Sequence, residues 1–171
     1  MSLSTMSVSS LDPLLLDSRP VDSHQKFLHF SIKSEENVLL ALEHITEVIR
    51  LKTAEILPVP EVSDCVLGIT NWRGEMLWLV DLGKLAGDPP LFAVQGKLLP
   101  VIVVQAKGQS LGFAVQSIGD IELHDPTQIQ PVASGLFPPK LLPLLSGYLP
   151  SKGGAVLDVA ITQLPLWKTP H

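Results

Sequence analysis

Residues 66–82, VLGITNWRGEMLWLVDL, place an arginine between two apolar segments. The runs VLGI and MLWLVDL are typical of a protein core, whereas the intervening NWRG ends in Arg73-Gly74, a pair that suits a turn. Burying an arginine costs several kcal/mol unless a carboxylate or a carbonyl pairs with it. Arg73 is therefore solvated on a turn, held by a partner within the chain, or offered to another protein.

The composition predicts a folded chain outside membranes. Of the 171 residues, 46% are hydrophobic and 17% charged, which suits one domain or two small subdomains that share a core. The longest charge-free apolar run, LLPVIVV at residues 98–104, is far shorter than the roughly 20 residues that span a bilayer. The first 24 residues lack the basic start and the cleavage site of a signal peptide. We therefore expect a cytoplasmic protein without direct membrane insertion, with residues 1–24 as a flexible tail.

The charges, the cysteine and the histidines argue against several classes of protein. The formal net charge is −5 and the 12 Lys and Arg residues are scattered, so no nucleic acid partner is expected. The single cysteine, Cys65, excludes an internal disulfide and a cysteine-based zinc site, and its apolar neighbours predict a small buried side chain. The five histidines show no metal-binding spacing, and no nucleophile motif accompanies His124-Asp125. We predict no enzymatic activity, no metal and no cofactor.

Short strand-like runs separated by Gly, Pro, Asp and Ser fill the chain from Phe27 onward, a pattern that predicts a mostly β fold. Two short helical segments are also expected, one after Asp81 in LGKLAG and one within PKLLPLLSGY. The runs predicted to be strands are residues 27–32, 37–42, 45–50, 74–82, 99–105, 110–115, 117–123 and 154–161.

The chain also contains an internal repeat. A shift of 73 residues lays LALEHITEVIRLKTAEILPV over FAVQSIGDIELHDPTQIQPV, with apolar positions matched in order and Glu47 over Asp120. Upstream, the same shift lays Phe30 over Val103. We therefore expect approximate repeats at residues 27–90 and 98–162.

Two repeats of about five strands each predict a particular architecture. Closing each sheet would remove the exposed edges of a long open sheet, and surplus apolar residues would fill the space between the closed sheets. The predicted fold is therefore mostly β, with two pseudo-symmetric five-stranded SH3-like β-barrel subdomains packed around a shared core, and with short helical segments.

Several of these segments together resemble the CheW family. The resemblance rests on FLHF from Phe27, LEHITEVI from Leu42, VLGITNWRG from Val66 with LVDL from Leu79, and VLD from Val156, over roughly residues 25–162. Its most specific part is G-x-x-N-x-R-G followed by V-D-L. The resemblance implies a domain of two five-stranded barrels, here residues 25–168, and a non-enzymatic adaptor of chemotaxis signal transduction.

The resemblance also implies partners and a site. CheW proteins join the regulatory domain of a CheA-type histidine kinase to the cytoplasmic tip of a chemoreceptor. The motif arginine, here Arg73, lies near the receptor-binding groove in the family and pairs with a glutamate, here Glu47. Two alternatives stay open, a CheW-like scaffold of a pilus or phototaxis system and a generic peptide-binding β-barrel module. The partner-binding residues implied are Glu47, Val48, Ile69, Asn71, Trp72, Arg73 and Gly74.

Two residues depart from the family pattern, and one segment departs from the internal repeat. Trp72 stands where an aliphatic residue is usual, and Trp78 where a proline is common; we expect Trp78 to be partly buried and Trp72 at least partly exposed, since tryptophan suits both cores and interfaces. In the second repeat PSKG stands in place of NWRG. We therefore expect the charged motif to belong to the first half alone, as a binding site on one barrel would.

Overall fold

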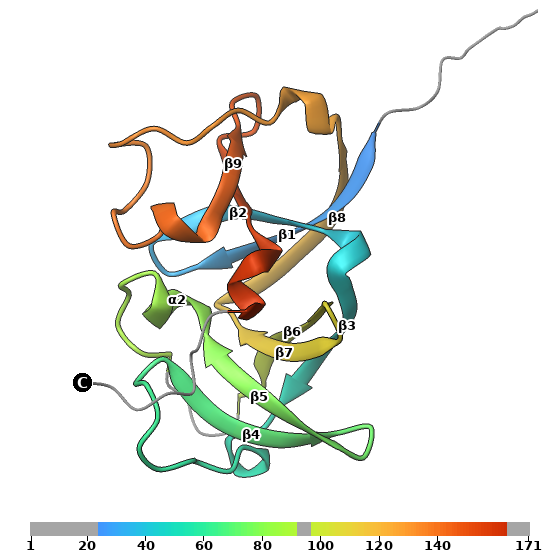
Figure 1. The fold of residues 1–171 in the computed structure, drawn as a ribbon, viewed down its shortest axis with the longest axis vertical. Coiled ribbons are helices and arrows are strands. Elements are labelled where there is room, and N and C mark those ends of the chain that lie inside the picture. The colour runs from blue at the N-terminus through green and yellow to red at the C-terminus, as the bar shows by residue number, and fades with distance from the viewer. Residues whose placement is uncertain (1–23, 92–96, 164–171) are drawn as a thin grey trace, which may run out of the picture.

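The fold consists of two five-stranded β-sheets, each curled into a small barrel and stacked one above the other (Figure 1). The computed structural model describes residues 24–91 and 97–163, so the predicted tail at residues 1–24 lies outside the described residues except for His24. Within these two ranges, no helix has the length and apolar character needed to cross a membrane.

One sheet, which we call barrel 1, takes its strands from both ends of the chain. Its order is β8-β1-β2-β10-β9, and all neighbours are antiparallel except β2 and β10. Its strands are β1 (Gln25–Ile32), β2 (Glu35–Ala41), β8 (Ser117–His124), β9 (Leu145–Leu149) and β10 (Gly154–Leu157).

The other sheet, barrel 2, is built from five consecutive strands. Its order is β3-β6-β7-β5-β4, with β5 and β7 as the parallel pair. Its strands are β3 (Ile45–Leu51), β4 (Val66–Trp72), β5 (Glu75–Asp81), β6 (Leu99–Ala106) and β7 (Gln109–Ala114). Barrel 2 is therefore a continuous segment inserted between β2 and β8 of barrel 1.

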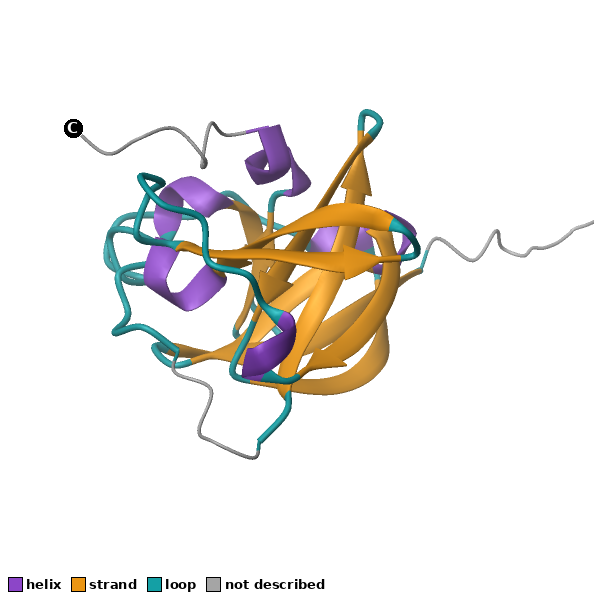
Figure 2. Cartoon of the chain, turned by 90° about the horizontal axis from the view of Figure 1, so that it is seen from below, coloured by secondary structure: helices purple, strands orange, loops and turns teal. Residues whose placement is uncertain are grey.

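Short helical turns lie around the strands (Figure 2). They are α2 (Leu82–Leu85), η1 (Leu42–His44), η2 (Thr53–Glu55), η3 (Pro126–Gln128), η4 (Leu142–Leu144) and η5 (Val159–Gln163). The helical segments predicted after Asp81 and within PKLLPLLSGY are thus confirmed as α2 and η4.

The two barrels share one topology. When β1–β5 are matched with β6–β10, the order of barrel 1 becomes the order of barrel 2. In each barrel, a residue that follows a short 3₁₀ turn forms an isolated antiparallel β-bridge with a later strand. These bridges join Leu57 to Ile69 in barrel 2 and Gln130 to Tyr148 in barrel 1. The prediction of a mostly β fold with two pseudo-symmetric five-stranded barrels is confirmed.

The register of the repeat changes at a β-bulge. The pair of Phe30 with Val38 in barrel 1 corresponds to the pair of Val104 with Leu111 in barrel 2. The positions of β1 and β6 therefore differ by 74 residues, whereas those of β2 and β7 differ by 73. The difference is one extra residue of β2, where the pairing with β1 is irregular. The predicted match of Phe30 with Val103 is therefore wrong by one residue, which in a strand places the side chain on the opposite face.

Most of the described core lies between the barrels. One cluster of 20 buried residues joins side chains of both barrels, for example Phe30 of β1 and Phe113 of β7. The clusters inside barrel 2 and barrel 1 contain seven and four buried residues. Cys65 lies in the shared cluster at 4% exposure, as predicted for a small buried side chain. The shared core therefore holds the two barrels together.

Two strands, β4 and β9, are present although the sequence patterns do not predict them. The end of one predicted strand also differs. The predicted strand at residues 154–161 is wrong beyond Leu157, because Asp158 accepts a hydrogen bond from the N–H of Ala160 at 2.9 Å and the chain turns into η5.

Candidate partner-binding site

The strands β4 and β5 are joined by the two-residue turn Arg73-Gly74, which lies between the paired residues Trp72 and Glu75. Arg73 has a φ of 53° and Gly74 a φ of 78°, and a type I′ hairpin turn requires positive φ at both positions. The conformation costs about 1 kcal/mol or more at a residue other than glycine. The turn places the arginine at the tip of the hairpin.

Glu47 of β3 contacts this hairpin. Its Oε1 accepts a hydrogen bond from Nε1 of Trp72 at 3.0 Å and lies 2.9 Å from Nη2 of Arg73. Since β3 and β4 are the two edge strands of the sheet, these contacts run from edge to edge and help to close barrel 2. The pair of Arg73 with Glu47 that the family resemblance implies is present.

Trp72 connects the parts of the site. Its half-buried indole packs against the core of barrel 2, and the guanidinium carbon of Arg73 lies 4.9 Å from the centre of its ring. A cation over an aromatic ring at a solvent-accessible site contributes about 0.5–1 kcal/mol. Trp78 is half-buried against the shared core, so the predicted exposures of both tryptophans are confirmed.

The position of Arg73 combines two of the three possibilities that the sequence allows. Its side chain is 60% exposed and that of Glu47 is 35% exposed, so the arginine lies on a solvated turn and is also held within the chain. Screening by water limits such a pair to roughly 0–1 kcal/mol. The geometry leaves much of the guanidinium open to solvent, where another protein could reach it.

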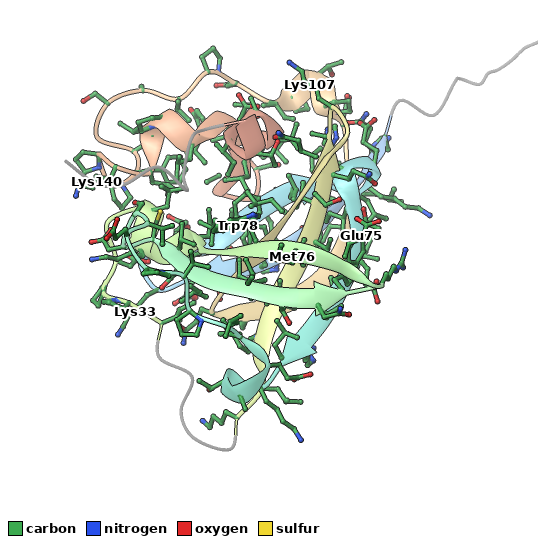
Figure 3. All side chains as sticks on the ribbon, turned by 60° about the horizontal axis from the view of Figure 1, so that its bottom comes forward. Lys33, Glu75, Met76, Trp78, Lys107 and Lys140 are labelled. Carbon is green, nitrogen blue, oxygen red and sulfur yellow. The ribbon has the colours of Figure 1, made fainter. Side chains whose placement is uncertain are left out.

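The predicted site residues divide between two faces. Trp72 lies on the inner side of β4, whereas Ile69 and Asn71 lie on the outer side, paired with Trp78 and Met76. Met76 is 71% exposed. It lies on β5 after the turn (Figure 3). Met76 is not among the residues predicted from the sequence, although an apolar residue two positions after a hairpin glycine could have suggested it.

Val48 is separate from this hairpin. It lies on β3 next to Glu47, is 38% exposed, and pairs with Ile102 of β6. Neighbouring residues of a strand point to opposite faces, so Val48 and Glu47 do not share a surface.

Barrel 1 carries a second cation–carboxylate pair at its corresponding hairpin. Lys152 precedes Gly153 between β9 and β10, and its Nζ donates a hydrogen bond to Oε2 of Glu122 on β8 at 2.8 Å. The expectation that the charged motif belongs to the first half alone is therefore wrong for the pairing itself. PSKG lacks the arginine, but its lysine reaches a glutamate on β8, the strand that corresponds to β3.

Two histidines complete this cluster. His124 lies 2.8 Å from Oε1 of Glu122, and Nδ1 of His29 lies 3.6 Å from Oε2. Burial raises the pKa of Glu122, but hydrogen bonds from Lys152 and His124 and the positive charges of Lys152 and His29 outweigh it, so the pKa lies below its ordinary value. The side chains of the cluster are 17% to 32% exposed, so it is less open than the pair at Arg73.

Other acidic residues have structural roles. The Asp81 carboxylate accepts hydrogen bonds from the N–H groups of Lys84 at 3.0 Å and Leu91 at 2.7 Å, and thereby caps α2. In the described part of the chain, no group of three or more His, Cys, Asp and Glu side chains is arranged to hold a metal ion.

Fold and site together define a small all-β domain of two fused barrels with a charged, partly exposed hairpin. The chain belongs to the CheW-like domain family, which it matches over residues 26–160. It is 35% identical over 78 residues to the chemotaxis protein CheW of Rhizobium meliloti (strain 1021), a match that covers 43% of this chain and 46% of the relative. The chain therefore spans about half the length of the curated relative that it matches.

The fold is also similar to a solved structure. The crystal structure of the scaffolding protein TtCheW from Thermoanaerobacter tengcongensis superposes with a TM-score of 0.63 at 22% sequence identity, covering 78% of this chain and 86% of that one. At this identity the likeness is one of fold.

Proposed function

We propose that the protein is a non-catalytic, cytoplasmic adaptor of chemotaxis signalling. It would join the regulatory domain of a CheA-type histidine kinase to the cytoplasmic tip of a chemoreceptor, so that the state of the receptor biases the kinase. Membership in the CheW-like family and the likeness to a scaffolding protein support this proposal.

The observation that carries the proposal is the exposed ion pair at the tip of the β4–β5 hairpin. Arg73 is held by Glu47 through one nitrogen, Nη2, while its side chain stays 60% exposed. A guanidinium has five N–H donors, so it can bind Glu47 and an acceptor on a partner at the same time. The site therefore suits contact with the receptor tip, with Glu47, Trp72, Arg73 and Gly74 at its centre.

The other predicted residues would extend this contact. Ile69 and Asn71 lie on the outer face of the same hairpin beside Met76, and we add Met76 to the proposed surface. Val48 would contribute only if the receptor also reaches the outer face of β3. Interfaces of transient signalling complexes are small and depend on a few anchor residues.

The test is a calorimetric titration of the protein against the kinase regulatory domain and against a receptor tip fragment, both from its own source organism. The first variant is Arg73→Glu, which turns the attraction for an acidic group into repulsion. We expect at least about a tenfold loss of affinity for the receptor fragment and unchanged affinity for the kinase domain.

Lys107→Glu is the matched control. Lys107 has a φ of 52° and precedes Gly108, whose φ is 78°, so the control repeats the charge change and the turn geometry at the β6–β7 hairpin. Figure 3 shows Lys107 away from Glu75, the residue that follows the Arg73-Gly74 turn. Equal losses in both variants would assign the effect to overall charge.

The titration also separates the alternatives. Binding of the folded wild-type protein to neither partner would overturn the chemoreceptor proposal and favour a scaffold of another pathway or a peptide-binding module. Binding to both partners without an effect of Arg73→Glu would keep the adaptor and overturn the site.

A further inference from the structure

We propose that Trp72 is a positioning residue, whose indole fixes Glu47 with its N–H and Arg73 with its face before any partner arrives. This inference rests on the proposed function, because it describes how the same site would recognise its receptor. It names a role that the ion pair alone does not supply.

The hydrogen bond from the Trp72 indole orients the carboxylate of Glu47. Both contacts described for this carboxylate, from Trp72 at 3.0 Å and from Arg73 at 2.9 Å, involve Oε1. The other oxygen, Oε2, has no described contact within residues 24–91 and 97–163. Because two donors converge on one oxygen, the carboxylate is oriented and Oε2 remains available as an acceptor.

The face of the Trp72 indole restricts the side chain of Arg73. The ring of Trp72 lies under the guanidinium, with 4.9 Å between the guanidinium carbon and the ring centre. A long arginine side chain at an exposed hairpin tip otherwise loses rotamer entropy when a partner immobilises it. Stacking on the ring and pairing with Glu47 restrict the side chain in the free protein, which lowers that cost on binding.

Trp72 is itself anchored in barrel 2. Its side chain is half-buried and packs against the core of barrel 2, so the platform is fixed by the fold. An aliphatic residue at this position could fill the same space, but it could neither donate to Glu47 nor stack with Arg73.

The arrangement predicts the chemistry of the partner surface. Arg73 presents its remaining donors and Glu47 presents Oε2 beside it. The complementary group is a carboxylate next to a hydrogen-bond donor, such as an acidic side chain beside an amide, hydroxyl or basic side chain on a protein surface.

Two substitutions separate the contributions of the indole. Trp72→Phe keeps an aromatic face but removes the N–H, and Trp72→Leu removes both. Trp78→Phe is the control, since Trp78 lies on the opposite face of the same hairpin, where it is paired with Ile69. Urea unfolding verifies that each variant is folded.

The first measurement uses the free protein. Nuclear magnetic resonance relaxation of the Arg73 Nε–H group reports how ordered the side chain is. We expect lower order in Trp72→Phe, still lower order in Trp72→Leu, and no change in Trp78→Phe. Unchanged order in both Trp72 variants would overturn the inference.

The second measurement is a double-mutant cycle with the receptor tip fragment. We expect Trp72→Phe to weaken binding roughly 3- to 10-fold when Glu47 and Arg73 are present, and less than about twofold in a background that carries both Glu47→Ala and Arg73→Ala, since the indole then has neither group to position. Equal losses in the two backgrounds would show a merely structural role and overturn the inference. Loss of Arg73 order in the Trp72 variants, together with unchanged binding by Arg73→Glu, would support the positioning role and overturn the receptor role of the site.

Discussion

Two glycines show why single residues decide how the barrels close. Gly68 and Gly147 pair with Leu79 and Val156 at equivalent places in the two sheets. A Cβ on Gly68 would lie 2.3 Å from the carbonyl oxygen of Leu57, the bridging residue of barrel 2. A Cβ on Gly147 would lie 2.7 Å from the carbonyl oxygen of Gln130, the bridging residue of barrel 1. Each barrel is closed by a backbone approach that only glycine permits.

The first prediction follows from these distances. Gly68→Ala and Gly147→Ala should each lower the free energy of unfolding by about 2–3 kcal/mol, because the bridging segment must move away. Gly74→Ala and Gly108→Ala are the controls: both positions have positive φ, as Gly68 also does, but no atom lies within 4 Å of the added carbon, so each should cost about 1 kcal/mol from strain alone. Urea titration measures all four, and similar losses throughout would contradict the closing role.

At the scale of elements, the corresponding hairpins of the two barrels both form an ion pair with an edge strand, but the two pairs differ in exposure. Each hairpin carries a basic residue before a glycine of positive φ, Arg73 in barrel 2 and Lys152 in barrel 1, and each contacts a glutamate of an edge strand. The pair in barrel 1 is more buried and includes two histidines. Barrel 1 therefore uses its pair for local stability, whereas barrel 2 leaves its arginine exposed.

The second prediction concerns acid. The lowered pKa of Glu122 means that its ionised form stabilises the fold at pH values above the ordinary value of about 4.5, and that this contribution is lost as the pH falls through the lower pKa of the folded state. Glu122→Gln should therefore be less stable than wild type at pH 7, by about 1–2 kcal/mol for a charge-assisted hydrogen bond. The difference should shrink as the pH falls below 4.5.

Urea unfolding between pH 3 and pH 7 measures this difference. Asp120→Asn, an exposed carboxylate two residues away on the same strand, should change stability little at any pH. A constant difference between Glu122→Gln and wild type across the range would show that the Glu122 charge is not involved.

The elements also show what the sequence could predict. Short apolar runs with turn residues between them identify eight of the ten strands, because local patterning suffices there. The sequence does not reveal β9, whose residues LSGYL follow two prolines and look like the end of a helical turn. It also cannot show that one extra residue in β2 shifts the repeat, since a bulge is defined only by its partner strand.

The candidate site, like the fold, could be predicted only in part. The motif around Arg73 and Glu47 is visible in the sequence through the family resemblance, and the contact between them is present. The hydrogen bond from Trp72 and the pair of Lys152 with Glu122 were not predictable, because both join residues more than 20 positions apart whose proximity depends on how the barrels close.

At the scale of the whole molecule, the chain path binds the barrels into one unit. Barrel 2 is continuous from β3 to β7, but barrel 1 needs β1 and β2 from before that segment and β8 to β10 from after it. The shared cluster of 20 buried residues exceeds the seven and four inside the barrels. A barrel without its neighbour would therefore expose most of the apolar surface that stabilises it.

The third prediction is that the two barrels unfold together. Phe113→Ala, in the shared cluster, should cost about 3–5 kcal/mol and lower amide protection equally in β4–β5 of barrel 2 and β9–β10 of barrel 1. Phe27→Ala is the matched change inside barrel 1, and it should likewise destabilise both barrels, because barrel 1 contributes residues to the shared core. Two measurements test the coupling of the barrels: hydrogen exchange of the two hairpins, and urea unfolding monitored by tryptophan fluorescence and by circular dichroism.

Coincident unfolding transitions are expected in both variants. If the Phe27→Ala protein loses protection in barrel 1 while barrel 2 stays protected, barrel 2 is stable by itself and the shared core does not unite the fold.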